Sequence, residues 1–197
     1  MIDRREFIGT MGAVAVGAVL PACSPARSAT RLSNVGVQLY TVRTLMEKDV
    51  ERTLAGVAAA GYTEVEFAGY FKKTPAEIKA MLDRHGLVSP SVHSGSMAPA
   101  DWAAALEAAN VIGHKFIVMP WIPVERRKTL DDWKQVAADF NRLAASAKAA
   151  GLQFAYHNHD FEFPLVEGKV PYDVLLAETD PNLVKLEIDL YWITKGG

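Results

Sequence analysis

The fold is decided by KFIVMPW (115–121) and LQFAYHNH (152–159), two short stretches on either side of a long helical segment. Both are rich in apolar and aromatic residues, as buried strands are. The segment between them, TLDDWKQVAADFNRLAASAKAAG (129–151), has apolar residues at helical spacing, and Thr129 and Asp132 form a variant of the capping box at its start. A strand, a long helix and a second strand predict a parallel βα unit.

The same alternation extends over the chain from Asn34 onward. We expect strands at 35–42, 62–69, 87–95, 115–121, 152–159 and 182–192, and helices at 47–60, 74–86, 99–113, 129–151 and 170–179. Six strands alternating with five helices fit either a doubly wound open sheet or a (β/α)8 TIM barrel. The sequence holds no GxGxxG motif after the first strand and no Walker motif, so the nucleotide-binding open sheets lose their main support.

Polar and aromatic residues gather where the predicted strands end. They are Gln38, Tyr40, Glu66, His93, Trp121, the YHNHDFEF stretch (156–163), Glu187, Asp189 and Trp192. Chemistry at the carboxyl ends of successive strands is typical of barrels, so the sequence predicts an α/β TIM barrel over residues 34–197. A complete barrel has eight βα units in about 250 residues. Because about six units are predicted here, we expect an incomplete barrel, truncated at its C-terminus.

The composition is that of an ordinary globular domain: 197 residues, 50% hydrophobic, 22% charged, with a formal net charge of -2. A nucleic-acid-binding protein would normally present a basic face, and this chain has more acidic than basic residues. We therefore expect no nucleic-acid partner. The single cysteine, Cys23, excludes an internal disulfide framework and a cysteine-based zinc cluster.

Residues 1–23 have the features of an export signal. Arg4 and Arg5 precede the apolar run MGAVAVGAVL (11–20) and resemble a twin-arginine signal, so we expect export through that route. LPAC (20–23) resembles a lipobox, which predicts a periplasmic lipoprotein that touches the membrane only through a lipid on Cys23.

The alternative at this end of the chain is cleavage near Ala22 or Ala29, which would release a free periplasmic protein. Residues 24–33 follow and read as a flexible tether, because they show no apolar periodicity.

Glu162 and Asp189 are the first candidates for a metal site. They follow predicted strands five and six, which are neighbours in a barrel, so both carboxylates can converge at its mouth. Two carboxylates that close repel each other unless a cation lies between them. Oxygen ligands favour Mg²⁺ or Mn²⁺, and an added imidazole shifts the choice toward Mn²⁺, Co²⁺ or Zn²⁺. The alternative is that each acid caps a helix or pairs with a surface lysine.

Three histidines and two tryptophans are candidates for substrate binding. A period of two places His157 and His159 on one face of the fifth strand, and His93 ends the third. Imidazoles can donate hydrogen bonds to sugar hydroxyls, although a structural role is as common for a histidine. Trp121 and Trp192 suit a wall on which a sugar ring stacks, with core packing as the alternative.

Five motifs together identify a family. GVQLYTVR (36–43), EVEFAGY (64–70), SVHSG (91–95), YHNHDFEF (156–163) and EIDLYW (187–192) resemble, in this order, the sugar phosphate isomerase/epimerase family of xylose-isomerase-like TIM barrels in the AP endonuclease 2 superfamily. An AP endonuclease of this superfamily would need a basic groove and a histidine-rich multi-zinc cluster, which the net charge disfavours.

The resemblance implies roles for particular residues. It makes Glu162 a metal ligand and the acid/base, Asp189 a second metal ligand, His93 a substrate-side histidine and Glu66 an acid near the pocket. In the family, a histidine on strand seven and a glutamate on strand eight complete the site. We therefore expect a product that ends at residue 197 to be inactive, while its full-length parent would be an enzyme. Trp192 stands where related ketose epimerases often have a histidine, which disfavours a simple ketose 3-epimerase.

The expected activity is isomerisation or epimerisation of a sugar or keto-sugar through an enediolate, with a bound divalent metal, Mn²⁺ or Mg²⁺ before Co²⁺ or Zn²⁺. A lyase or dehydratase that acts on a keto-sugar, an inositol derivative or a glycoside would use the same site. A non-catalytic, tethered sugar-binding protein is the alternative from another class. The sequence is also compatible with a homo-oligomer.

Overall fold

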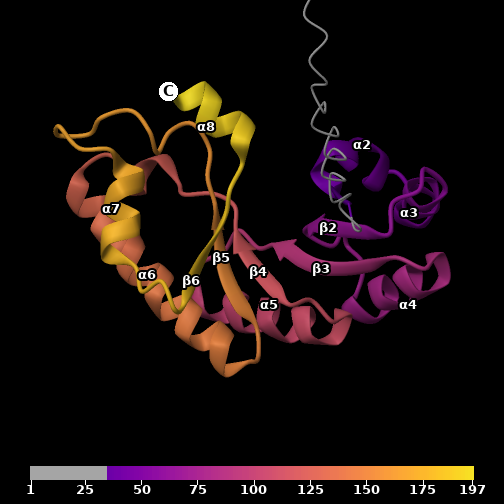
Figure 1. The fold of residues 1–197 in the computed structure, drawn as a ribbon. Coiled ribbons are helices and arrows are strands. Elements are labelled where there is room, and N and C mark those ends of the chain that lie inside the picture. The colour runs from indigo at the N-terminus through magenta and orange to yellow at the C-terminus, as the bar shows by residue number, and fades with distance from the viewer. Residues whose placement is uncertain (1–34) are drawn as a thin grey trace, which may run out of the picture. The chain divides into compact units, whose positions relative to one another are not determined.

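A computed structural model describes residues 35–197, so the predicted signal, Cys23 and the tether lie outside the described residues. Six parallel strands form one sheet in the order β1-β2-β3-β4-β5-β6 (Figure 1). The strands are β1 Gly36–Gln38, β2 Glu64–Ala68, β3 Val88–His93, β4 Phe116–Met119, β5 Gln153–His157 and β6 Val184–Glu187. The α/β prediction is confirmed, and sequential parallel strands in chain order are the arrangement of a TIM barrel.

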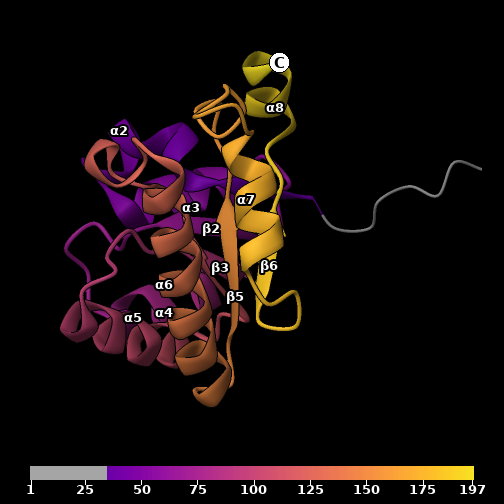
Figure 2. The same cartoon turned by 90° about the vertical axis from the view of Figure 1, so that its left-hand side faces the viewer.

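Helices connect the strands. They are η1 Leu39–Val42, α2 Arg43–Met46, α3 Val50–Ala59, α4 Pro75–His85, α5 Pro99–Ile112, η2 Val124–Arg126, α6 Leu130–Ala149, α7 Pro171–Glu178 and α8 Leu190–Gly196, where η marks a 3-10 helix. Figure 2 shows α4, α5 and α6 side by side along one face of the sheet. Among residues 35–197, no helix combines the length and the hydropathy that crossing a membrane requires.

The predicted capping box of α6 is confirmed. The Thr129 hydroxyl accepts a hydrogen bond from the backbone N–H of Asp132 at 3.2 Å, and the Asp132 carboxylate accepts one from the backbone N–H of Thr129 at 2.9 Å. Two N–H groups that the first turn of a helix leaves free are thereby satisfied. The helix then packs Trp133 and Phe140, both fully buried, against the sheet.

Two of the predicted strands run into segments that the structure shows as helix. The stretch 182–192 was expected to be one strand, but β6 ends at Glu187 and a helix begins after Asp189, whose carboxylate accepts a hydrogen bond from the backbone N–H of Trp192 at 3.0 Å. The stretch 35–42 ends as a strand at Gln38, whose side chain accepts a hydrogen bond from the backbone N–H of Tyr40. In both places a side chain captures the next N–H groups and turns the backbone out of the sheet.

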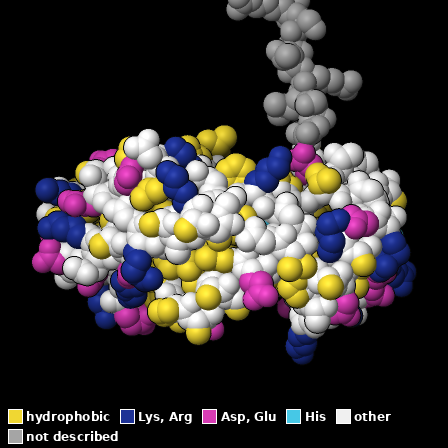
Figure 3. Space-filling model, turned by 90° about the horizontal axis from the view of Figure 1, so that it is seen from below, with side chains coloured by type: hydrophobic (Ala, Val, Ile, Leu, Met, Phe, Trp, Pro, Cys, Tyr) yellow, Lys and Arg dark blue, Asp and Glu magenta, His cyan; other side chains and the backbone are white. Residues whose placement is uncertain are grey.

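Figure 3 shows the molecule from below, where apolar side chains lie among charged ones of both signs. None of the described histidines is visible on this face. β5 and β6 rise away from it toward their carboxyl ends in Figure 1, so the polar residues that follow these two strands belong to other parts of the surface.

An ion-pair network between α3 and α4 gives stability a pH dependence. The Glu51 carboxylate lies 2.5 Å from Arg84 Nη2 and 2.6 Å from His85 Nε2. These hydrogen bonds, that of Arg84 first, lower the pKa of Glu51 from 4.5 to about 2. Because the folded state has the lower pKa, this stabilisation is complete above pH 4.5 and is lost as the pH falls toward 2.

We expect Glu51→Gln to reduce the loss of stability between pH 7 and pH 3 relative to the wild type, because the variant has no carboxylate to protonate there. Urea unfolding midpoints at both pH values measure this. Glu107→Gln is the matched control, since Glu107 is exposed and makes no described ion pair within residues 35–197. The same loss of stability in Glu51→Gln and in the wild type would contradict the account.

Candidate metal and sugar site

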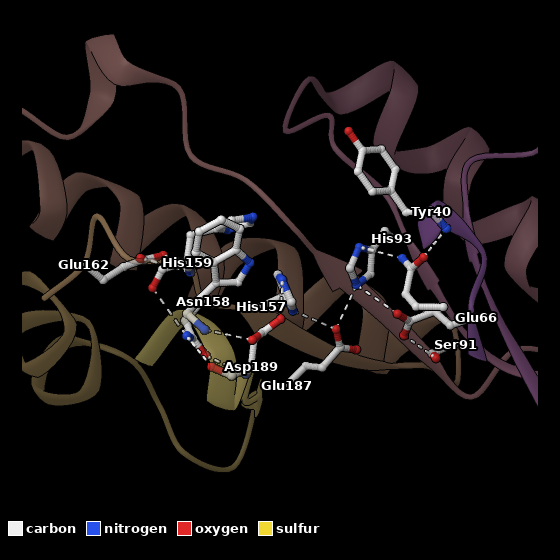
Figure 4. Close-up of polar contacts among 12 residues, drawn as sticks. Tyr40, Glu66, Ser91, His93, His157, Asn158, His159, Glu162, Glu187 and Asp189 are labelled. Atoms are coloured by element: carbon white, nitrogen blue, oxygen red, sulfur yellow. Dashed lines mark hydrogen bonds and ion pairs between the residues drawn. The ribbon is translucent and has the colours of Figure 1, made fainter. Parts of the chain in front are cut away.

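A cluster of carboxylates and imidazoles lies at the carboxyl ends of the strands. His93, the last residue of β3, stands between Glu66 of β2 and Glu187 of β6 (Figure 4). His93 Nε2 lies 3.0 Å from Glu66 Oε1 and 2.8 Å from Glu187 Oε1. Since β3 and β6 are not neighbours in the sheet, their side chains meet across the concave face that the curved strands enclose.

Neighbouring side chains fix the orientation of the cluster. The Ser91 hydroxyl donates to Glu66 Oε2 at 2.5 Å, and Gln38 Nε2 lies 3.2 Å from His93 Nδ1. Each ring nitrogen of His93 therefore has a polar partner. Residues held by such partners keep their geometry without a ligand, as binding sites require.

Opposite charges in this cluster shift the pKa values of His93 and Glu187. Burial alone would lower the pKa of His93, but its hydrogen bonds to Glu187 and Glu66 outweigh burial and raise that pKa to about 9. Burial would raise the pKa of Glu187, yet the imidazoles of His157 and His93 beside its carboxylate hold that pKa far below its usual range. At neutral pH the carboxylate of Glu187 is thus charged and pairs with the protonated ring of His93.

His157 adds a second imidazole. Its Nδ1 atom is buried 3.0 Å from Glu187 Oε1, but without the alignment of a hydrogen bond, and its Nε2 atom lies 3.9 Å from Asp189 Oδ2. His93, His157 and Glu187 each offer one ligand atom, and these atoms all lie within 4.8 Å of one another. The three side chains can converge on one divalent cation.

Glu162, the acid that sequence motifs favoured, lies elsewhere. It follows β5 in a loop and is fully buried. Its carboxylate accepts hydrogen bonds from the Tyr156 hydroxyl and, at 3.0 and 3.1 Å, from the backbone N–H of His159. Burial raises the pKa of Glu162. Glu162 does not belong to the group of three ligands gathered among the described residues.

Asp189 and Asn158 tie together the two loops that follow β5 and β6. The backbone N–H of Asp189 donates to Asn158 Oδ1 at 3.0 Å, and Asn158 Nδ2 donates to the carbonyl oxygen of Asp189 at 3.3 Å. Asp189 Oδ1 caps α8 by accepting from Trp192. Within residues 35–197, Asp189 Oδ2 accepts no hydrogen bond and faces His157.

An aromatic wall borders the cluster, and we define it as Trp121, His159, Phe161 and Trp192. The His159 ring stacks on Phe161 with 5.4 Å between centroids and lies 5.1 Å from Trp121 and 5.3 Å from Trp192. His159 was expected on the same strand face as His157, but β5 ends at His157 and His159 stands in the loop. Burial, then the neighbouring His157, lowers the pKa of His159 to about 4.

Glu187 was predicted to lie at a strand end, but it was not predicted to bind metal or substrate. The missed signal is the spacing of two between Glu187 and Asp189, which places both acids on one side of an extended segment. Arg127 was not among the predicted site residues, because it lies in a loop with no motif of its own.

Parallel strands in chain order, with carboxylates and imidazoles gathered at their carboxyl ends, define a protein of the TIM-barrel class with a candidate metal site. The chain belongs to the xylose isomerase-like TIM barrel family, whose model matches residues 54–196.

Solved structures and curated proteins resemble this chain. A sugar phosphate isomerase/epimerase from Parabacteroides distasonis ATCC 8503 matches with a TM-score of 0.74 and 29% identity over 90% of this chain and 72% of that one. The IOLI protein with a binding zinc atom matches in fold, with a TM-score of 0.56 and 13% identity over 78% and 61% of the two chains.

Inosose dehydratase from Lacticaseibacillus casei is 26% identical over 165 residues, which are 73% of this chain and 54% of that protein. The chain thus spans about half the length of the curated relatives that it matches.

Proposed function

We propose that the whole protein is a divalent-metal-dependent isomerase or epimerase that acts on a sugar or keto-sugar. The observation that carries the proposal is the convergence of His93, His157 and Glu187 at the strand ends. Similarity to a sugar phosphate isomerase/epimerase supports the reaction class, and the zinc atom in the IOLI structure supports a metal in this fold.

The three residues fit a first-row divalent metal. Two imidazoles and one carboxylate suit Zn²⁺, Co²⁺ or Mn²⁺ better than Mg²⁺, which prefers oxygen ligands. His157 Nδ1 is buried without a hydrogen bond, as an unused ligand atom would be. Bound there, such an ion would polarise a substrate carbonyl and favour loss of a proton from the adjacent carbon.

Asp189 is the residue that we assign to proton transfer. A general base needs an oxygen that can reach the substrate, and Asp189 Oδ2 accepts no hydrogen bond within residues 35–197. Both Glu162 oxygens are already hydrogen-bonded inside the protein. Asp189 would take the proton beside the carbonyl and deliver it to the neighbouring carbon, which isomerises the sugar. Epimerisation would instead add a proton to the opposite face of the same carbon from a second acid or from water. The aromatic wall would hold the ring.

A dehydratase is the second candidate, favoured by the similarity to inosose dehydratase. The same proton abstraction would then be followed by loss of a hydroxyl from the next carbon as water.

Proton exchange tests the proposal without knowledge of the final product. We expect the purified full-length parent protein with Mn²⁺ or Zn²⁺ to exchange the proton beside the carbonyl of one member of a keto-sugar panel in D₂O, as followed by NMR. Asp189→Asn should slow exchange by about 100-fold or more, because general bases contribute that much. Asp131→Asn, at an exposed position, is the matched control. Equal exchange in the wild type and in Asp189→Asn would contradict the assignment, and no exchange by metal-loaded protein would contradict the proposed function.

A further inference from the structure

We propose that Arg127 recognises an acidic group on the substrate, so that the substrate class is an anionic sugar carrying a carboxylate or a phosphate. This inference rests on the proposed function, because it takes the aromatic wall to be the place where the sugar binds. Both acidic groups offer the paired oxygen acceptors that a guanidinium binds.

Arg127 lies in the loop between η2 and α6 and is held by aromatic rings. Its guanidinium carbon is 3.4 Å from the centroid of the Phe161 ring and 4.8 Å from that of Trp121. Both rings belong to the aromatic wall and also contact His159. The guanidinium therefore stands at the border of the wall, with its orientation fixed by cation-π contacts.

The side chain of Arg127 has no polar partner within residues 35–197. Its Nη1 atom is buried without a hydrogen bond, and its guanidinium forms no ion pair. A buried donor without an acceptor is unfavourable, so such groups usually have a ligand or water to bind. Glu162 is near enough for Arg127 to lower its pKa, but the Glu162 oxygens accept from Tyr156 and His159 instead.

The adjacent arginine shows the contrast. Arg126 Nη2 lies 2.8 Å from Asp139 Oδ2, and Arg126 Nη1 lies 3.2 Å from Met97 Sδ. The two successive arginines thus differ in their partners. Arg126 binds a loop residue and a helix residue, whereas the N–H groups of Arg127 have no acceptor within residues 35–197. A guanidinium whose face is stacked on a ring can still donate two parallel hydrogen bonds from its edge, which matches a carboxylate or a phosphate.

The test compares binding of glucuronate, glucose 6-phosphate and glucose by isothermal titration at low salt with EDTA present. We expect wild-type protein to bind at least one acidic sugar about tenfold or more tightly than glucose, the effect of one charged hydrogen bond. Arg127→Met should reduce that affinity to the level of glucose, and Arg127→Lys should lie between, since it keeps the charge but loses the fork. Arg126→Met is the matched control and should bind as the wild type does.

The acid that binds identifies the group: glucuronate alone indicates a carboxylate site, glucose 6-phosphate alone a phosphate site, and both a site for either. Equal affinity for all three sugars, no binding of either acid, or wild-type affinity in Arg127→Met would overturn the inference. Thermal unfolding of each variant reports whether it is folded. If Arg127→Met does not fold, the affinity of Arg127→Lys decides the result. Sugar binding is measured with EDTA and therefore without metal, whereas proton exchange is measured with metal bound. A negative result for the Arg127 inference can thus be told apart from a negative result for the proposed function.

Discussion

Glu187→Gln is expected to lower the affinity for Zn²⁺ or Mn²⁺ by about 100-fold or more, since even residues that only orient metal ligands contribute 10- to 100-fold. Glu187 supplies the one carboxylate of the three-ligand group and lies 2.8 Å from His93 and 3.0 Å from His157. Without its charge, two imidazoles would remain, and the cation would lose its only anionic ligand in that group. Isothermal titration with each metal measures the change.

Glu162→Gln is the control for this substitution, because it removes a carboxylate of the same kind from a buried position. We expect it to bind metal about as the wild type does, although the resemblance of YHNHDFEF (156–163) to family motifs implies a ligand there. Loss of metal in Glu162→Gln, together with wild-type affinity in Glu187→Gln, would show that the metal binds at Glu162 instead.

Phe140→Ala is expected to destabilise the protein by about 3–5 kcal/mol, the range for phenylalanine deletions in cores. Phe140 is fully buried in α6, with its ring centroid 5.4 Å from that of Phe154 and 4.9 Å from that of Tyr156. Deleting it leaves a cavity between the longest helix and β5. Such a loss is a large share of the 5–15 kcal/mol by which domains are typically stable.

Urea unfolding measures this change. Leu165→Ala is the control, because the Leu165 side chain is 69% exposed and its truncation should change stability by no more than about 0.5 kcal/mol. If Phe140→Ala unfolds at the same urea concentration as Leu165→Ala, the packing of α6 on β5 does not stabilise the fold as described.

Local patterns predicted the elements of the fold well. Thr129 at the start of α6 and Gly86 at the end of α4 are helix boundary signals that depend only on neighbouring residues, and the structure places caps at both. The end of β6 was missed because LYW after Asp189 continues an apolar pattern that suits a strand as well as a helix. The hydrogen bond from Trp192 to Asp189 decides for the helix, and apolar spacing does not reveal it.

The sequence indicated that polar residues would gather at the strand ends, but not which side chains would touch one another. Strand ends indicated where His93 and Glu187 would lie, yet their contact joins residues 94 positions apart on strands that are not neighbours. Only the curvature of the sheet brings them together. Glu162 was expected to face the mouth, but the hydroxyl of Tyr156 holds it inside. That contact depends on how the loop folds back, which spacing alone does not determine.

The most direct test of the three-ligand site is anomalous diffraction from crystals soaked with Zn²⁺ or Mn²⁺. The account predicts one strong anomalous peak within bonding distance of His93, His157 and Glu187, with Glu162 still hydrogen-bonded to Tyr156. A peak bound by Glu162 and Asp189, with His93 and Glu187 still paired to each other, would contradict it.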